Sequence, residues 1–163
     1  MAKIIPNQNT WIGFVSTLGD TTTLIPTDLE IDNAIDVTPL VISLNAASQG
    51  NVVPTPSLDS LFETSIPGTS QATFSGDFYR DDTDDTAWEL WERGDRGYFI
   101  VSRYGGSNTT THAPDTAGDV CEVWPVFIVS KTMANMANNT VETFTLTCSV
   151  PQEPNEAAVV VPD

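Results

Sequence analysis

The sequence predicts a mainly β fold of antiparallel strands with one short α-helix at about residues 83–93. Thr and Val, which favour strands, are frequent, whereas strong helix formers are sparse. Several segments alternate apolar and polar side chains with a period of two, as strands with one buried face do. In chain order, the predicted strands are residues 10–16, 37–44, 72–79, 97–104, 120–130 and 141–150.

The last predicted strand has the clearest alternation. Its apolar side chains fall on one face, and its hydroxyl side chains fall on the other: Thr143, Thr145, Thr147 and Ser149. The preceding segment, residues 131–140, contains three Asn and has the length of an extended hairpin loop. Strands 120–130 and 141–150 are therefore predicted to pair antiparallel.

The helix is predicted from a cluster of acids followed by an apolar stripe. Four Asp lie within residues 81–85, where carboxylates cap free N–H groups and oppose the positive end of the helix dipole. Apolar side chains between residues 87 and 91 form one stripe that can pack on a sheet. Gly94 suits the position just after the end of a helix. Strands precede and follow this segment, which predicts a strand–helix–strand unit.

Two polar stretches interrupt the strand pattern. Residues 45–71 have no regular period and contain Pro54, Pro56 and Pro67, and residues 105–118 are polar throughout. Both stretches are predicted to be loops. The first is long enough to be a functional arm rather than a tight turn.

The net charge excludes one class of partner. The chain of 163 residues carries 22 acidic and six basic side chains, a net charge of −16 at pH 7. Binding to duplex DNA or to an anionic membrane requires a basic face, which six basic residues cannot build. The longest apolar run, residues 123–129, is far shorter than the roughly 20 residues of a membrane span. We therefore expect a soluble protein made in a cytoplasm, with Cys121 and Cys148 as free thiols.

No pattern of residues predicts catalysis, a cofactor or a bound metal. The sequence has no GxSxG elbow, Walker A loop or GxGxxG turn. The Asp cluster at 81–85 could be a calcium site, but it lacks the Gly and distal Glu of an EF-hand loop, and helix capping accounts for it. His112 stands alone in a polar loop. We predict that the protein is not an enzyme.

The Trp residues leave a second function open. Exposed Trp side chains could stack on sugar rings, which would make the chain a carbohydrate- or metal-binding β-sandwich module on a virion or a secreted protein. Burial in a core or in a subunit interface is the competing interpretation. The four residues concerned are Trp11, Trp88, Trp91 and Trp124.

The order of short motifs along most of the chain resembles one protein family. The motifs lie at residues 35–38, 53–62, 65–68, 74–79, 91–98, 119–129, 144–147 and 151–154. The most specific is the turn Arg93-Gly94-Asp95-Arg96-Gly97 between the predicted helix and the next strand. In this order they resemble the major tail tube protein of long, non-contractile-tailed (siphovirus-type) bacteriophages, as found in phages of actinobacteria. Residues 106–117 and the two Cys belong to no motif of this resemblance.

The resemblance implies a fold and an assembly. The fold would be an antiparallel β-sandwich or partial barrel flanked by one helix, in a single domain over residues 1–163 with extended termini. Such subunits form hexameric rings whose inner strands close a wide barrel, and the rings stack into the tail tube that conducts genomic DNA. The implied partners are further copies of the chain, a tape-measure protein, a tail terminator and baseplate or distal tail proteins. The implied location is the virion, after assembly in the host bacterial cytoplasm.

The resemblance also assigns assembly roles to parts of this chain. The arm that reaches other subunits or rings maps to about residues 45–65, with the two termini as further arms. The Thr-rich face of the last strand becomes a candidate lumen or ring surface. The residues predicted to make assembly contacts are Asn45, Gln49, Asn51, Pro54, Leu58, Phe62, Thr143, Thr145 and Thr147. An acidic or neutral lumen would let DNA slide through without being bound.

Overall fold

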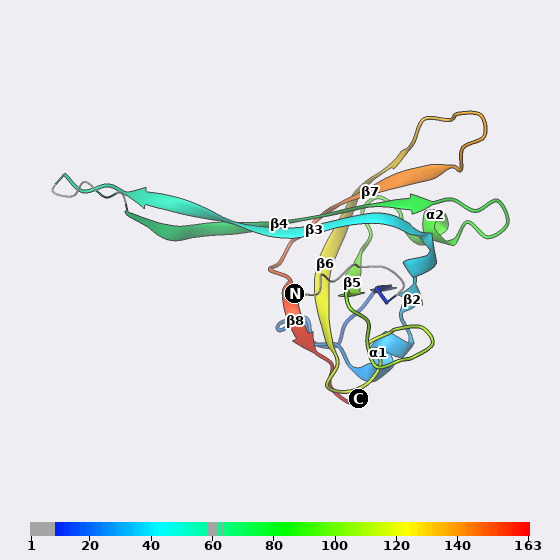
Figure 1. Cartoon of the computed structure of the whole chain (residues 1–163), viewed down its shortest axis with the longest axis horizontal. Helices are drawn as coiled ribbons and strands as arrows, with labels where there is room; N and C mark the ends of the chain where they lie inside the picture. The colour runs from blue at the N-terminus through cyan, green and yellow to red at the C-terminus, as the bar shows by residue number, and fades with distance from the viewer. Residues whose placement is uncertain (1–8, 59–61, 63) are drawn as a thin grey trace, which may run out of the picture.

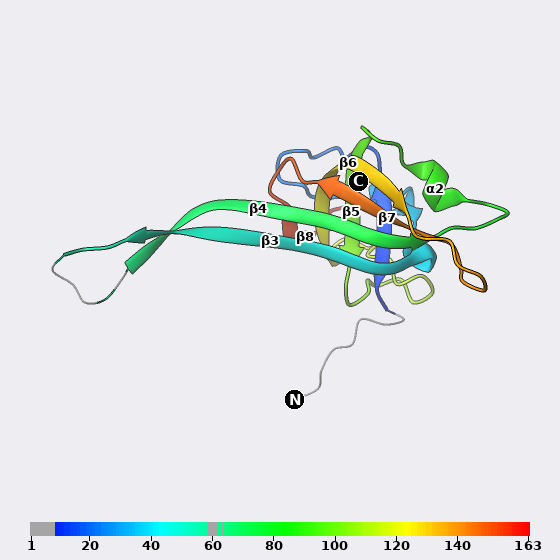
Figure 2. The same ribbon diagram turned by 90° about the horizontal axis from the view of Figure 1, so that it is seen from above.

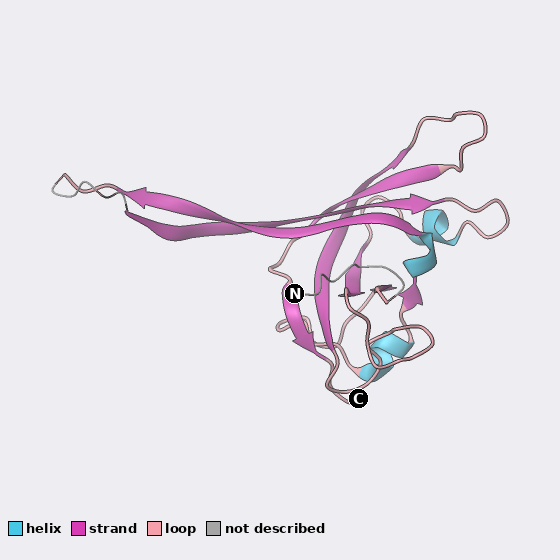
Figure 3. Ribbon diagram, viewed as in Figure 1, coloured by secondary structure: helices cyan, strands magenta, loops and turns pink. Residues whose placement is uncertain are grey.

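Eight antiparallel strands form one bent sheet in the computed structural model, which describes residues 9–58, 62 and 64–163 (Figures 1 and 3). The strands are β1 (Trp11–Val15), β2 (Ile35–Asp36), β3 (Val41–Thr55), β4 (Thr64–Tyr79), β5 (Arg96–Ser102), β6 (Val120–Met133), β7 (Thr143–Ser149) and β8 (Asn155–Val159). The helices are α1 (Asp28–Asp32), α2 (Thr86–Leu90) and the single turn η1 (Thr38–Leu40). The strand order is β2-β1-β5-β6-β7-β4-β3, and β8 pairs with β6. The sheet does not close into a barrel, so β2 and β3 are edge strands.

The sheet is bent because its two halves share one hydrophobic core. Strands β4 and β7 turn their apolar faces towards β1, β5 and β6, and aromatic rings fill the space between them. The ring of Phe78 stacks on Phe144 with centroids 5.5 Å apart and lies 4.9 Å from Trp91. Phe74 stacks on Phe99 at 4.6 Å, which joins the outer strands to the central ones.

A second core covers the opposite face of the central strands. Trp11, Ile100 and Val123 point away from the aromatic core and pack under α1 and the C-terminal segment. Because β1, β5 and β6 are buried on both faces, their sequences are nearly continuous apolar runs. The pairing of β6 with β7 was predicted and is observed, with Ile128 opposite Cys148.

The helix near residues 83–93 is shorter than predicted. The observed helix is α2 alone, residues 86–90, and the backbone is already extended at Trp91. The Asp residues do not cap it as expected: Asp85 pairs with Arg80, and Asp81 accepts backbone N–H groups inside the preceding loop. Gly94 has the left-handed φ of 99° that favours glycine, but it turns the chain into β5 rather than ending the helix.

The structure contains a second α-helix that the periodicity did not predict. Helix α1 is too short to show a helical period, yet it carries a complete capping box. The Thr27 side chain accepts the N–H of Glu30, and the Glu30 carboxylate accepts the N–H of Thr27 at 2.9 Å. The sequence signal was Thr-x-x-Glu at residues 27–30.

The predicted strand at 37–44 and the loop at 45–71 were also wrong in their boundaries. Pro39 lies in the helical turn η1, so the strand starts only at Val41. From there β3 continues to Thr55, and β4 begins at Thr64, so most of the predicted loop is a long hairpin. Its small polar side chains are exposed on both faces, which removes the alternation that identifies a half-buried strand.

Candidate assembly surfaces

A two-stranded arm projects from the body of the protein. Strand β4 pairs with β7 only from Thr73 onwards, whereas its pairing with β3 continues from Ser48↔Ala72 to Thr55↔Thr64. We call residues 48–58, 62 and 64–72 the arm. Figures 1 and 2 show it extending away from the sheet in both views. The predicted arm at 45–65 therefore lies largely on this hairpin, and its residues 59–61 and 63 lie outside the described residues.

The far half of the arm exposes large apolar side chains. Leu58 is fully exposed and Phe62 is 76% exposed. Behind them, Val53 lies opposite Ile66 on one face of the ribbon, and Val52 lies on the other. All three of these side chains are about half exposed or more. Exposed apolar groups collected in one place mark an interaction surface.

The arm is also nearly free of charge in a strongly acidic chain. Between Val37 and Gly76 the sequence has two charged residues, Asp59 and Glu63, and both lie outside the described residues. Pro54 and Pro67 lie in its strands, where they offer no N–H to a further strand. The arm is therefore suited to contacts through side chains rather than to open-ended strand addition.

Strands β3, β4, β7 and β6 share a polar face on the side opposite the aromatic core. Paired residues of neighbouring strands lie on the same face, and the register joins Asn45 to Ser75, Ser75 to Thr147, and Thr147 to Ser130. We call this the polar face: Ser43, Asn45, Gln49, Ser75, Asp77, Ser130, Thr132, Thr143, Thr145 and Thr147.

Asp77 connects three strands at the centre of the polar face. The Ser43 hydroxyl on β3 donates to Asp77 Oδ2 at 2.9 Å, and the Thr145 hydroxyl on β7 donates to Asp77 Oδ1 at 2.6 Å. Each is a charge-assisted hydrogen bond, the stronger kind. The carboxylate thus holds the polar face together and gives it negative charge.

The predicted contact residues fall into two groups in the structure. Asn45, Gln49 and the three Thr of β7 lie on the polar face, although they are far apart in the sequence. The others lie further out on the arm: Asn51, Pro54, Leu58 and Phe62. Sequence reasoning missed the apolar side chains behind the arm tip because it treated residues 45–71 as a loop without faces. It also missed Asp77, whose partners Ser43 and Thr145 lie on other strands and are far away in the sequence.

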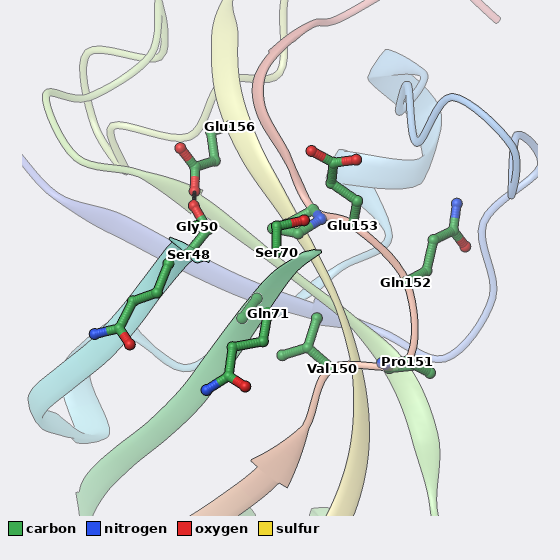
Figure 4. A pocket seen from close by; sticks show the side chains of 12 residues that line it. Ser48, Gly50, Ser70, Gln71, Val150, Pro151, Gln152, Glu153 and Glu156 are labelled. Carbon is green, nitrogen blue, oxygen red and sulfur yellow. Dashed lines mark hydrogen bonds between the residues drawn. The ribbon is translucent and has the colours of Figure 1, made fainter. Parts of the chain in front are cut away.

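A groove of about 370 Å³ separates the base of the arm from the C-terminal segment (Figure 4). Ser48 and Gln71 lie on the arm side, and Val150 and Glu153 lie on the other. The Ser48 hydroxyl donates a hydrogen bond to the Glu156 carboxylate across it. This hydrogen bond links the base of the arm to β8 and so helps to fix the direction in which the arm projects from the body.

The C-terminal segment lies on the body of the protein. Residues 155–159 pair with β6 as β8, and Val161 forms a bridge to Thr27. The predicted N-terminal arm falls mostly on residues 1–8, which lie outside the described residues.

Two of the backbone edges that have no strand partner among the described residues lie beside the polar face. The outer edge of β3 pairs with nothing along its length. Strand β6 pairs with β5 only as far as Phe127, so from Ser130 to Met133 it has β7 on one side alone. These two edges border the polar face at its opposite ends. Open edges of this kind are an aggregation hazard unless assembly covers them.

The Trp side chains do not form an exposed sugar-binding platform. Trp11, Trp91 and Trp124 are buried in the two cores. The ring of Trp88 is in contact with two cations, with Arg80 Cζ 4.7 Å and Lys131 Nζ 4.1 Å from its centroid. The carbohydrate-binding alternative therefore lacks the exposed Trp on which it depended.

The structure offers no reactive centre among the residues it describes. Within them, no group of three His, Cys, Asp or Glu is placed to hold a metal ion, and no helix is long and apolar enough to cross a membrane. Cys121 and Cys148 are free thiols, as predicted. Burial raises the pKa of each to about 12, which keeps them protonated and unreactive.

The comparisons with known proteins decide the family. The model of the phage tail tube protein family matches residues 1–163, the whole chain. The chain belongs to this family. It is a structural protein of the virion tail, as the order of the sequence motifs predicted. No curated protein matches the chain.

Solved structures share the fold of this tail tube protein. A chain from the virion of a native gene transfer agent particle is 15% identical with a TM-score of 0.59, covering 95% of this chain and 100% of that one. A chain from the tail of an empty gene transfer agent particle with C6 symmetry is 16% identical, with a TM-score of 0.58 and the same coverage. A chain from the sixfold-symmetrised baseplate of the anti-feeding prophage is 10% identical, with a TM-score of 0.58, covering 98% and 99%.

Proposed function

We propose that six copies of this chain close into a ring, that the rings stack into the tail tube, and that genomic DNA leaves the virion through the lumen. The observation that carries the proposal is the four-stranded band β3-β4-β7-β6, which is apolar on one face, polar on the other and open at both ends. The tail structure with C6 symmetry, which has the same fold, supports a sixfold ring.

Ring closure is proposed to join the two open edges of neighbouring subunits. The outer edge of β3 in one subunit pairs with β6 of the next, along residues 130–133 beyond its pairing with β5. Each subunit offers both edges, so the contact is head to tail and closes when the rotation between subunits completes a circle. Closure also removes the exposed edges and their aggregation hazard.

The lumen wall is proposed to be the polar face. The side chains that make up this face are hydroxyls and amides, apart from one charged side chain, Asp77. A wall of this kind repels phosphates weakly or is neutral to them, so it does not hold the duplex as it passes. The role is structural and needs no catalytic group. The other proposed partners are a tape-measure protein, a tail terminator and baseplate or distal tail proteins.

Electron microscopy of the purified full-length protein tests the proposal. We expect stacked rings or tubes, with sixfold symmetry in averaged end views and the polar face lining the lumen. A monodisperse monomer at all concentrations, or a ring whose lumen is lined by basic residues, would contradict it. A monomer that bound glycans would instead revive the carbohydrate-binding alternative.

A further inference from the structure

Lys131 is a charged side chain on the core-facing side of an open strand edge. It lies in the segment of β6 from Ser130 to Met133, which has β7 on one side alone. The register pairs Lys131 with Leu146, so both side chains are on the face opposite the polar face, where Leu146 is completely buried. Lysine is unusual on a core-facing side because burying an ammonium group is costly. The other three residues of the segment are uncharged.

The ammonium group of Lys131 is held by its own subunit. Lys131 Nζ donates a hydrogen bond to the Trp88 carbonyl oxygen at 2.7 Å and lies 4.1 Å from the centroid of the Trp88 ring. That ring packs edge-on against Phe144 of β7, with centroids 5.2 Å apart, so it is fixed against the sheet. The charge is therefore kept beside the open edge instead of extending into solvent.

The partner that this charge opposes most strongly is a second copy of the same edge. Two copies of one strand pair antiparallel about a two-fold axis perpendicular to the sheet, which keeps both polar faces on the same side. Registers that pair three of the open residues 130–133 place this axis beside Lys131 or beside Thr132. The two Lys131 side chains are then directly opposite each other or diagonal neighbours. Like charges placed opposite each other destabilise strand pairing, and long side chains also reach each other across the diagonal.

The edge that ring closure is proposed to bring to β6 carries no charge. Strand β3, residues 41–55, has no charged residue. Its side chains on the same face as Lys131 include Leu44 and Ala46, which pack against the aromatic core. Strand β3 of the next subunit therefore meets the ammonium group without like-charge repulsion, and the carbon stem of Lys131 offers it an apolar surface.

We infer that Lys131 determines the pairing specificity of the open β6 edge: it rejects a second β6 edge and accepts the uncharged β3 edge of the next subunit. Head-to-tail pairing continues around a ring, whereas pairing of two β6 edges gives a closed dimer in which neither subunit can complete one. Inward-pointing charged residues are one way in which natural edge strands avoid self-association. This inference rests on the proposed ring closure and names the residue that directs it.

Cross-linking of subunits below the concentration at which tubes form tests the inference. The probe is Thr132→Cys, at an exposed position on the polar face where two self-paired edges bring the thiols opposite each other or diagonally. It is combined with Lys131→Met, which keeps an unbranched stem and removes the charge. We expect the yield of covalent dimers from a short thiol-to-thiol cross-linker to rise about fivefold or more over the probe alone. Native Cys121 and Cys148 stay silent because both are buried.

Three controls separate the charge at this position from other effects. Lys131→Arg keeps a cation, and Arg93→Met changes the net charge by the same amount at an exposed position between α2 and β5. Both should leave the dimer yield within about twofold of the probe alone. The third control moves the probe to Leu29→Cys, an exposed position on α1, where Lys131→Met should add no dimers.

The dimer yields decide the inference. An unchanged yield from Lys131→Met, an equal rise with Lys131→Arg, or an equal rise at the Leu29 probe overturns it. Circular dichroism checks that each variant is folded. Lys131→Gln keeps an N–H donor for the Trp88 carbonyl and should give the same rise as Lys131→Met, so the result does not depend on the folding of one variant.

Tube formation is measured separately by electron microscopy. We expect Lys131→Met to give fewer tubes than the unmodified chain at equal concentration, because closed dimers remove subunits from ring assembly, and Lys131→Arg to form them normally. Raised dimers with an unchanged tube yield would contradict the directing role of Lys131. If the unmodified chain forms no tubes, the proposed function fails, whereas the dimer yields still show whether Lys131 rejects a second β6 edge.

Discussion

Single residues set how closely the central strands pack. Gly97 on β5 faces the ring of Phe14 on β1, and a Cβ at this position would lie 2.4 Å from Phe14 Cζ and 2.8 Å from the Val15 carbonyl oxygen. The backbone on one side and a buried ring on the other leave no direction in which strain can relax. Glycine here is a packing requirement, which residue type alone does not reveal, because Gly50 on the arm meets nothing within 4 Å.

This contrast gives a matched prediction on stability. We expect Gly97→Ala to lower the free energy of unfolding by about 1–3 kcal/mol through overpacking. At about 2–4 °C per kcal/mol for a chain of this size, the melting temperature should fall by several degrees. Gly50→Ala should leave it unchanged or slightly raised, because its surroundings are open. Thermal unfolding followed by circular dichroism measures both, and an equal loss for the two variants would refute the packing argument.

Elements differed in how well the sequence predicted them. Strand β7 was predicted within two residues at its start and one at its end, because Phe144, Leu146 and Cys148 enter a core while the Thr between them do not. The arm was mistaken for a loop because both of its faces are exposed, so nothing in its sequence alternates. The length of the stretch nevertheless predicted an arm rather than a tight turn, and its role in assembly stays a prediction. The acidic cluster before α2 misled the helix boundaries because its carboxylates act in a loop and on Arg80.

Residues 51–69 of the arm are predicted to be dispensable for folding and required for assembly. Replacing them by Asn-Gly, a two-residue turn suited to a hairpin, keeps β3 and β4 paired up to Gly50↔Ser70 and leaves both cores untouched. We expect a folded monomer that forms no long tubes, measured by sedimentation and electron microscopy. As a control, the shortened protein should melt within a few degrees of the full chain. Tubes of normal length from this variant would contradict the role given to the arm.

At the scale of the whole molecule, charge and shape act in opposite directions on assembly. A net charge of −16 makes free subunits repel each other, while in the proposed tube the open edges and the apolar side chains in the far half of the arm attract them. The attractive surfaces are close to neutral: the arm has no charge among its described residues, and the polar face carries Asp77. The repulsion is therefore spread over the body, whereas the attraction is local and apolar.

Added salt should therefore promote the assembly of this protein into tubes rather than cause the tubes to dissociate. The screening length falls from about 30 Å at 0.01 M to about 10 Å at 0.1 M ionic strength, which weakens repulsion between bodies but leaves apolar contacts intact. We expect the critical concentration for tube formation at pH 7 to fall about tenfold or more over this range, measured by light scattering. The chain shortened at residues 51–69 should stay unassembled at both salt concentrations. If tubes instead came apart as salt rose, ion pairs between subunits would have to hold the tube, and the apolar side chains of the arm would not be its main contact.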